Sequence, residues 1–245
     1  MDVSIRLTVI QSSSDVPLDR LAGWWSGVET VLVRADLGEP IPAASEVADA
    51  LVVLGGHMSA YDDEGAAWLP ALRTLLADAA RSGVPTLGIC LGAQLLAVAT
   101  GGRVQVAAPP GPEAGVVNVF WRPEALDDAF VGPFVANLPE RRVTAVPTLH
   151  SDAVVDLPPG AVWLASSNQY PYQAFRVGSA WGLQFHPEAS TTTMRDWARW
   201  DGTVDTDAIL ADYAAREDEL VETGAALAAG FLTVVREHAA RRVEA

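Results

Sequence analysis

The sequence predicts an α/β protein with a mainly parallel central sheet, helices on both faces of that sheet, a β-rich second half and a helical C-terminal extension. Three observations carry this prediction. In the first hundred residues, short apolar runs alternate with segments of helical periodicity, as in sheets whose crossovers are helices. Between residues 104 and 185, strand-like pieces are separated by proline and glycine. After Pro187 the helical pattern returns.

The first hundred residues contain the signals of a parallel sheet. The run ALVVLGG is wholly apolar and ends in two glycines, which is typical of a buried parallel strand that stops in a loop. Leucines at helical spacing follow, with the acidic residues 62–64 before them at the positive end of the expected helix, and Gly83 and Pro85 end the pattern. We expect strands at residues 3–10, 30–33, 50–56 and 85–89, and helices at about 18–25, 68–79 and 92–100.

The second half of the sequence has a different pattern of apolar and polar residues. The pieces AGVVNVF, AVWLASS, YQAFRVG and AWGLQF alternate apolar and polar residues and predict short strands. The segments TTTMRDWARW and TDAILADYAA and a last helix at about 217–240 form the extension, residues 189–245. We expect residues 1–245 to fold as one domain, with His238 a solvated charge near a helix C-terminus and AREDELVE a solvated helix face. Four tryptophans are expected to pack in the core: Trp24, Trp25, Trp197 and Trp200.

Composition excludes several classes of function. The 245 residues carry a formal net charge of −15, which disfavours nucleic acid and anionic membranes as partners. All 16 basic residues are arginine, so phosphate-loop and Schiff-base lysines are absent. A single cysteine allows no internal disulfide, and we see neither a secretion signal nor an apolar run long enough for a membrane span. We therefore expect a cytoplasmic protein.

The only cysteine stands between an expected strand and an expected helix. In the stretch GICLG, Cys90 is flanked by Gly88 and Gly92, the pattern of a nucleophile elbow, where glycine permits sharp turning and close backbone packing. The free N–H groups and dipole of a helix N-terminus favour a thiolate. Two interpretations are open at this point: a small core residue, or an activated nucleophile.

A second stretch, GLQFHPE, carries a base and a carboxylate. His186 and Glu188 stand two residues apart, and residues two apart on a strand share a face, so the carboxylate can hold the imidazole in one tautomer. An exposed turn is the alternative interpretation. Together with an elbow cysteine, the pair would complete a Cys-His-Glu triad.

These two stretches resemble the class I glutamine amidotransferases, whose catalytic domain hydrolyses glutamine through such a triad. The likeness extends to VVLGGHMSAYDDE and to HSDAVVDLPPGA, covers residues 51–188, and leaves the first fifty residues as the opening strands of a flavodoxin-like fold. The resemblance implies a nucleophile, a general acid and base, and an orienting carboxylate: Cys90, His186 and Glu188. It also implies an oxyanion hole from the N–H groups of Gly56 and Leu91, and contacts to the glutamyl part of the substrate from Gln94, Ser151 and Asp152.

Three functions follow as alternatives. The first is hydrolysis of the γ-amide of glutamine through a γ-glutamyl thioester, by a free-standing enzyme or by a subunit that supplies ammonia to a separate synthase. The second is a γ-glutamyl hydrolase or peptidase that acts on γ-glutamyl amines or peptides. The third is a non-catalytic binding module. We expect no cofactor, and no spacing such as HExxH or CxxC predicts a metal site. Many relatives have proline where this chain has His57. Two interpretations are open for His57, a residue that lines the pocket and alters selectivity or a loop residue that faces solvent, and we expect the second.

Overall fold

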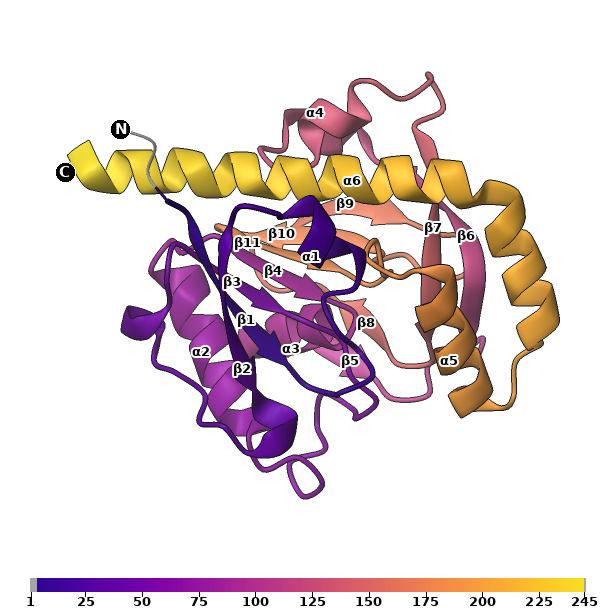
Figure 1. The fold of residues 1–245 in the computed structure, drawn as a ribbon, viewed down its shortest axis with the longest axis horizontal. Helices are drawn as coiled ribbons and strands as arrows, with labels where there is room; N and C mark the ends of the chain where they lie inside the picture. The colour runs from indigo at the N-terminus through magenta and orange to yellow at the C-terminus, as the bar shows by residue number, and fades with distance from the viewer. Residues whose placement is uncertain (1–3, 245) are drawn as a thin grey trace.

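A nine-stranded mixed sheet forms the centre of the protein (Figure 1). The computed structural model describes residues 4–244. The strand order is β2-β1-β3-β4-β11-β10-β9-β6-β7, and β5 and β8 form a separate two-stranded sheet. The central strands are β1 (Arg6–Gln11), β2 (Glu29–Arg34), β3 (Ala50–Val53), β4 (Thr86–Ile89), β6 (Glu113–Trp121), β7 (Val143–His150), β9 (Val162–Ser166), β10 (Ala174–Val177) and β11 (Ala180–Leu183); the small sheet contains β5 (Arg103–Gln105) and β8 (Ala153–Asp156).

Helices connect and cover these strands. The α-helices are α1 (Arg20–Trp24), α2 (Leu69–Arg81), α3 (Leu91–Ala99), α4 (Gly132–Val135), α5 (Thr191–Asp201) and α6 (Thr206–Glu244). Three short 3-10 helices complete the fold: η1 (Ala35–Leu37), η2 (Ala44–Glu46) and η3 (Pro123–Asp127). The predicted fold class is confirmed: strands and helices alternate up to α3, the middle of the chain is β-rich, and two helices form the extension.

Strand β11 joins the two halves of the sheet. It pairs with β4 in parallel and with β10 in antiparallel orientation. Strands β2, β1, β3 and β4 are all parallel to their neighbours, whereas β10, β9, β6 and β7 continue as an antiparallel series. Most strands of the β-rich half therefore extend the parallel sheet, whereas β5 and β8 pair separately.

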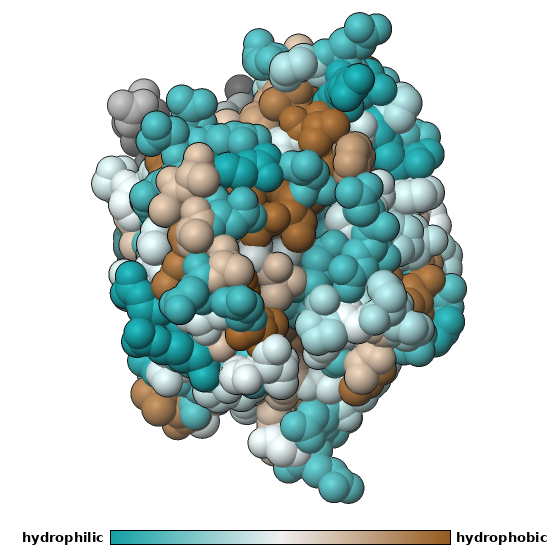
Figure 2. Space-filling model, turned by 90° about the vertical axis from the view of Figure 1, so that its right-hand side faces the viewer, coloured by the Kyte–Doolittle hydropathy of each residue, from teal (hydrophilic) through white to brown (hydrophobic). Residues whose placement is uncertain are grey.

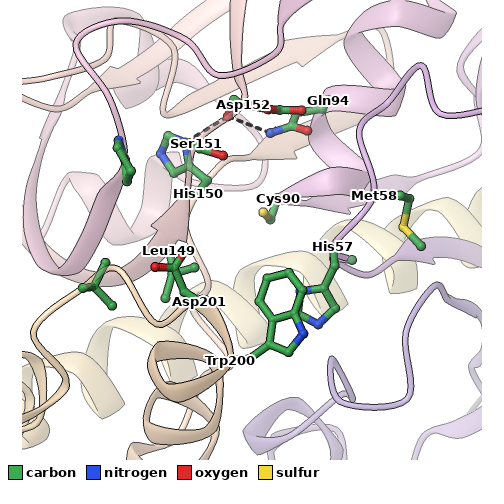
Figure 3. A pocket seen from close by; sticks show the side chains of 13 residues that line it. His57, Met58, Cys90, Gln94, Leu149, His150, Ser151, Asp152, Trp200 and Asp201 are labelled. Carbon is green, nitrogen blue, oxygen red and sulfur yellow. Dashed lines mark hydrogen bonds between the residues drawn. The ribbon is translucent and has the colours of Figure 1, made fainter.

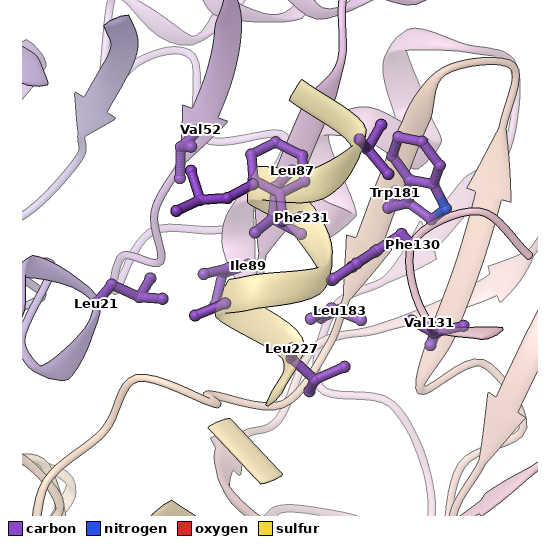
Figure 4. Packing of buried hydrophobic residues seen from close by; sticks show 14 of the residues in the cluster. Leu21, Val52, Leu87, Ile89, Phe130, Val131, Trp181, Leu183, Leu227 and Phe231 are labelled. Carbon is purple, nitrogen blue, oxygen red and sulfur yellow. The ribbon is translucent and has the colours of Figure 1, made fainter. Parts of the chain in front are cut away.

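The two faces of the sheet have separate apolar covers. Helices α2 and α3 pack on one face, through leucines of α2 such as Leu72 and Leu76. Helices α1 and α6 pack on the other. Figure 4 shows Leu227 and Phe231 of α6 lying over Leu87 and Ile89 of β4 and over Leu183 of β11. The strands that carry the candidate site residues are thus held from both sides.

The C-terminal extension differs from the expectation in one respect. The segment TDAILADYAA and the expected last helix are one continuous helix of 39 residues, α6, which bends near its start and then runs across the sheet (Figure 1). His238 is half-buried on this helix, and burial, followed by the charges of Arg242 and Arg241, lowers its pKa. The expectation of a solvated charge at that position was wrong.

Two further expectations need correction or limits. The acidic residues 62–64 do not begin α2, because they lie in turns before Leu69, where Asp63 pairs with Arg73 of the helix at 2.7 Å. Strand β1 begins at Arg6, and the expected start at Val3 lies outside the described residues.

Hydropathy on the surface is mixed. No helix among the described residues is long and apolar enough to cross a membrane. On the face shown in Figure 2, apolar residues gather near the middle of the view and polar residues surround them.

Candidate active site

Three neighbouring strands bring the predicted site residues together. In the sheet, β4 lies between β3 and β11, and its Gly88 is opposite Val53 of β3 and Gly182 of β11. Because the three strands are parallel, the loops after them emerge at one edge. These loops carry the double glycine at 55–56, Cys90 and the segment 184–188. The Cys90 N–H donates to the carbonyl oxygen of Leu183 at 2.7 Å, which ties the turn at Cys90 to the end of β11, where the segment 184–188 begins.

Cys90 stands on a strained turn between β4 and α3. Its backbone has φ 51° and ψ −106°, a combination that residues with a side chain rarely adopt. The flanking glycines are needed for packing: a Cβ at Gly88 would lie 2.5 Å from the carbonyl oxygen of Gly92, and a Cβ at Gly92 would overlap the carbonyl oxygen of Val53. The thiol is buried and forms no disulfide. The geometry is that of a nucleophile elbow.

His186 and Glu188 form a buried ion pair. The Nδ1–H of His186 donates to Glu188 Oε1 at 2.7 Å, and both side chains are almost wholly excluded from solvent. Burial by itself lowers the pKa of His186, but the Glu188 carboxylate and then Cys90 raise it, to about 10. The imidazole is therefore held as a cation at neutral pH. The sequence pattern placed these two residues at the end of a strand. In the structure they lie in the turn that follows β11.

The His186 ring is fixed from two further sides. A Cβ at Gly55 would lie 2.9 Å from His186 Cε1, so the ring occupies the space that a larger residue would need. On another side the ring centroid lies 4.4 Å from that of Trp197 on α5. The Trp197 Nε1–H donates to the carbonyl oxygen of Asp15 at 2.8 Å, which holds the indole in place.

The two expected oxyanion-hole residues lie side by side next to Cys90. A Cβ at Gly56 would lie 2.8 Å from Leu91 Cδ2. Within residues 4–244, neither the Gly56 N–H nor the Leu91 N–H donates a hydrogen bond. Both are therefore free to donate to a group bound at the thiol.

A cavity of about 120 Å³ opens beside Cys90 (Figure 3). Gln94, Ser151 and Asp152 all line it, so the structure brings the expected glutamyl-binding residues to the cysteine. The Gln94 amide donates to the carbonyl oxygen of Asp152 at 2.9 Å and to Gln184 Oε1 at 3.2 Å. Ser151 is exposed, and its carbonyl oxygen accepts from the Ala108 N–H at 2.8 Å.

Sequence reasoning missed two polar groups, one beside the Cys90 thiol and one in the wall of this cavity. Gln184, which is buried, has its amide nitrogen 3.6 Å from Cys90 Sγ. Its place two residues before His186 in the same short stretch was the available signal. The second group is His150, whose Nδ1 lies 3.0 Å from the Asp152 carbonyl oxygen and whose Nε2 lies 3.2 Å from Glu113 Oε2. Glu113 is buried and comes from a segment 37 residues away, so no local pattern could reveal the pair.

His57 does more than face solvent, and Trp200 does not pack in the core. The His57 Nε2–H donates to Asp15 Oδ2 at 2.6 Å, and its ring centroid lies 3.9 Å from the Trp200 ring. Trp200 on α5 is 61% exposed, and both residues line the cavity (Figure 3). The expectation for Trp200 was therefore wrong, whereas His57 is exposed, as expected, and in addition lines the cavity. The other three tryptophans are buried or half-buried in the core, as expected.

No metal site accompanies this arrangement. Among residues 4–244, no group of three or more His, Cys, Asp or Glu side chains is placed to hold a metal ion.

Comparison with known proteins identifies the family. The family profile described as glutamine amidotransferase class-I matches residues 24–198. This chain belongs to that family. This chain is 37% identical over 144 residues to a protein named GMP synthase [glutamine-hydrolyzing] from Thermomicrobium roseum. The match covers 59% of this chain and 24% of the relative. The chain thus spans about a quarter of the length of the curated relatives that it matches.

Two solved amidotransferase structures share the fold over almost the whole chain. A glutamine amidotransferase from Thermotoga maritima has a TM-score of 0.80 and 26% identity, covering 95% of this chain and 99% of its own. A glutamine amidotransferase from Methylobacillus flagellatus has a TM-score of 0.81 and 26% identity, covering 95% of this chain and 96% of its own. In both comparisons the uncovered 5% of this chain is much shorter than the extension after Glu188. Most of the extension is therefore matched as well.

Proposed function

We propose that this chain hydrolyses the γ-amide of glutamine to glutamate and ammonia, with Cys90 as the nucleophile. The observation that carries the proposal is the convergence of three groups at one edge of the sheet: an elbow cysteine, a buried His186 and Glu188 pair, and two free N–H groups. Membership of the class I glutamine amidotransferase family supports the same reaction.

In the proposed reaction the Cys90 thiolate attacks the γ-carbonyl carbon and a C–S bond forms. The oxyanion accepts hydrogen bonds from the N–H groups of Gly56 and Leu91. His186, a cation at neutral pH, donates its proton to the amide nitrogen; the C–N bond then breaks and ammonia leaves. A γ-glutamyl thioester remains. His186 next takes a proton from water, which attacks the thioester, and glutamate and the thiol are released.

We assign the glutamyl part of the substrate to the cavity lined by Gln94, Ser151 and Asp152. The loop at 150–152 is held by hydrogen bonds from Gln94 to the Asp152 carbonyl oxygen and from the Ala107 N–H to Asp152 Oδ1, each 2.9 Å long. A loop fixed in this way presents a constant polar surface to a small ligand.

The ammonia has two fates in this proposal. The chain matches about a quarter of the length of relatives named GMP synthase [glutamine-hydrolyzing]. Where the ammonia is used in synthesis, we propose that a synthase outside residues 1–245 accepts it. Where no such subunit acts, the ammonia is released to solvent.

Glutamate and ammonia release by the purified protein tests the proposal, with Cys90→Ala as the control. We expect both products in equal amounts, loss of both in the variant, and a γ-glutamyl hydroxamate when hydroxylamine is added to intercept the thioester. Equal release by the variant would exclude Cys90 as the nucleophile. Absence of any release from glutamine, with or without hydroxylamine, would favour a binding module.

A further inference from the structure

The turn that carries His186 and Glu188 is held by two helices outside it. The Ala189 N–H donates to the His186 carbonyl oxygen at 3.2 Å and closes the turn. The Glu188 carbonyl oxygen accepts from the N–H of Arg20, the first residue of α1, at 3.3 Å. The Ala189 carbonyl oxygen accepts from the hydroxyl of Tyr213 on α6 at 2.7 Å. The backbone around Glu188 is therefore fixed by α1 and α6.

The Glu188 side chain has little else to orient it. Its Oε1 accepts from the Nδ1–H of His186. Within residues 4–244 no donor reaches its Oε2, although the side chain is wholly buried. With a single hydrogen bond, the carboxylate takes its direction from the position of its own backbone. A shift of the turn therefore moves Oε1 away from the imidazole.

Helix α6 also touches the turn at Gly224. A Cβ at this position would overlap the carbonyl oxygen of Pro187, so the helix and the turn are in direct backbone contact. Gly224 follows Tyr213 by about three helical turns, so this contact is separate from that of the tyrosine hydroxyl. Two points of α6 thus hold the short segment 187–189.

A third contact runs through Arg20. Its guanidinium donates to Oε1 of Glu217 on α6 at 2.7 Å, and this partly buried ion pair fixes the start of α1 against α6. The backbone N–H of Arg20 is the group that donates to the Glu188 carbonyl oxygen. Helix α6 therefore restrains Glu188 through α1 as well.

These contacts lie outside the cavity and outside the family profile. Among the described residues that line the cavity beside Cys90, none comes from α6. The profile match ends at residue 198, whereas α6 begins at Thr206. Helix α6 also packs on the sheet through Leu227 and Phe231, so a role in the reaction has to be separated from a role in stability by measurement.

We propose that α6 positions the Glu188 carboxylate against the His186 ring, with the Tyr213 hydroxyl as the principal contact and Gly224 as the second. Tyr213 is then a positioning residue, because it acts through the backbone of the turn and touches no reacting atom. This inference rests on the proposed function. It makes the C-terminal extension part of the catalytic apparatus, although all three triad residues lie before it.

The test measures kcat and KM for glutamine in Tyr213→Phe, which removes the hydroxyl and keeps the buried ring in its apolar cluster. His186 transfers a proton in both halves of the proposed reaction, so both halves should slow together and KM should stay within about twofold. A misplacement of about 1 Å at a reacting group costs about a hundredfold in rate. We expect the smaller shift of the turn to lower kcat by about tenfold or more.

Thr223→Val is the matched control on the same helix. The Thr223 hydroxyl forms a buried hydrogen bond of 2.8 Å with the hydroxyl of Thr144 on β7, away from the turn. Each of the two variants leaves one buried polar group without its partner, so the urea unfolding midpoints of both should fall. Only Tyr213→Phe should lower kcat.

A second pair of variants tests the other contact and does not depend on Tyr213. Gly224→Ala pushes the helix against the Pro187 carbonyl oxygen. In Gly230→Ala, also on α6, the added Cβ would lie 2.6 Å from the carbonyl oxygen of Phe130, which lies between η3 and α4. Both changes crowd α6 against backbone, and both should lower the urea midpoint. Only Gly224→Ala should lower kcat at nearly constant KM.

The outcomes separate the inference from the proposed function. Wild-type kcat in both Tyr213→Phe and Gly224→Ala would overturn the inference and leave Cys90-dependent hydrolysis standing. Equal losses of kcat in Tyr213→Phe and Thr223→Val would also overturn it, because general loosening of α6 would then explain the effect. A raised KM at constant kcat would overturn it as well, since the helix would then act on substrate binding. No glutamate release by the wild-type protein would overturn the proposed function and the inference with it.

Discussion

His186 and Glu188 are joined by a hydrogen bond of 2.7 Å, and both side chains are almost wholly buried. Burial alone would favour a neutral imidazole, yet the carboxylate and Cys90 raise the pKa of His186 to about 10. Attraction between the buried groups thus outweighs the cost of desolvation. The consequence is a proton donor that stays charged at neutral pH.

Replacement of Glu188 by Gln should lower the pKa of His186. The amide keeps the size of the side chain but removes the negative charge, so burial then dominates and favours the neutral ring. The measurement is an NMR titration of the His186 Cε1 proton, with His238 in the same spectra as an internal control. An unchanged titration of His186 in the Glu188→Gln protein would show that the carboxylate does not hold the charge.

The same pair should make the stability of the protein dependent on pH. The pKa of His186 is raised on folding from 6.5 to about 10, so the contribution of its protonation is complete below about pH 6.5 and is lost as pH rises toward 10. We expect the free energy of unfolding to fall over this range in the wild type, and to fall less steeply in Glu188→Gln. Urea unfolding at a series of pH values provides the comparison, and parallel pH curves for the two proteins would contradict it.

The parallel half of the fold could be predicted from the sequence because its signals are local. An apolar run that ends in two glycines, and a cysteine between Gly88 and Gly92, each specify a strand and the turn after it. The continuity of α6 could not be predicted, because its apolar positions pack on strands far away in the chain, Leu227 and Phe231 among them. Its local pattern alone gave no reason to join two helical segments.

Gly92 tests the close approach of α3 to the sheet. A Cβ there would overlap the carbonyl oxygen of Val53, a backbone atom that cannot move without distorting β3. Overpacking of this kind costs about 1–3 kcal/mol. We expect Gly92→Ala to lower the urea midpoint clearly, whereas Gly23→Ala, where a Cβ meets nothing within 4 Å, should not. Equal midpoints for the two variants would refute the close approach.

The candidate site could be predicted only where its residues lie within short motifs. Cys90, His186 and Glu188 belong to two such stretches. The contact of His57 with Trp200 joins a loop after β3 to α5, about 140 residues later, and the contact of His150 with Glu113 joins two strands. Only the folded sheet creates these pairs, so neither partner has a recognisable neighbour in the sequence.

Gln184 offers a test of the environment of the thiol. Its amide nitrogen lies 3.6 Å from Cys90 Sγ and presents a donor to it. Gln184→Glu is nearly isosteric but places a negative charge beside the thiolate. We expect alkylation of Cys90 by iodoacetamide at neutral pH to slow by about tenfold or more, because each 1.4 kcal/mol of repulsion corresponds to a factor of about ten. Gln105→Glu makes the same change of charge on β5, outside the cavity. Cys90 of this control protein should be alkylated at the wild-type rate.

Replacement of Gly55 by alanine should lower the activity of the protein and leave its folding stability almost unchanged. A Cβ at this position would lie 2.9 Å from His186 Cε1 and 3.1 Å from Val16 Cγ1, both of them side-chain atoms, so Gly55→Ala should displace the imidazole and leave the backbone in place. A misplacement of about 1 Å at a reacting group costs about a hundredfold in rate. We therefore expect kcat for glutamine to fall by about that factor while the urea midpoint changes little. If kcat were retained, the imidazole would have to reach the leaving nitrogen from more than one position, and its close fit between Gly55 and Trp197 would have no part in the proton transfer.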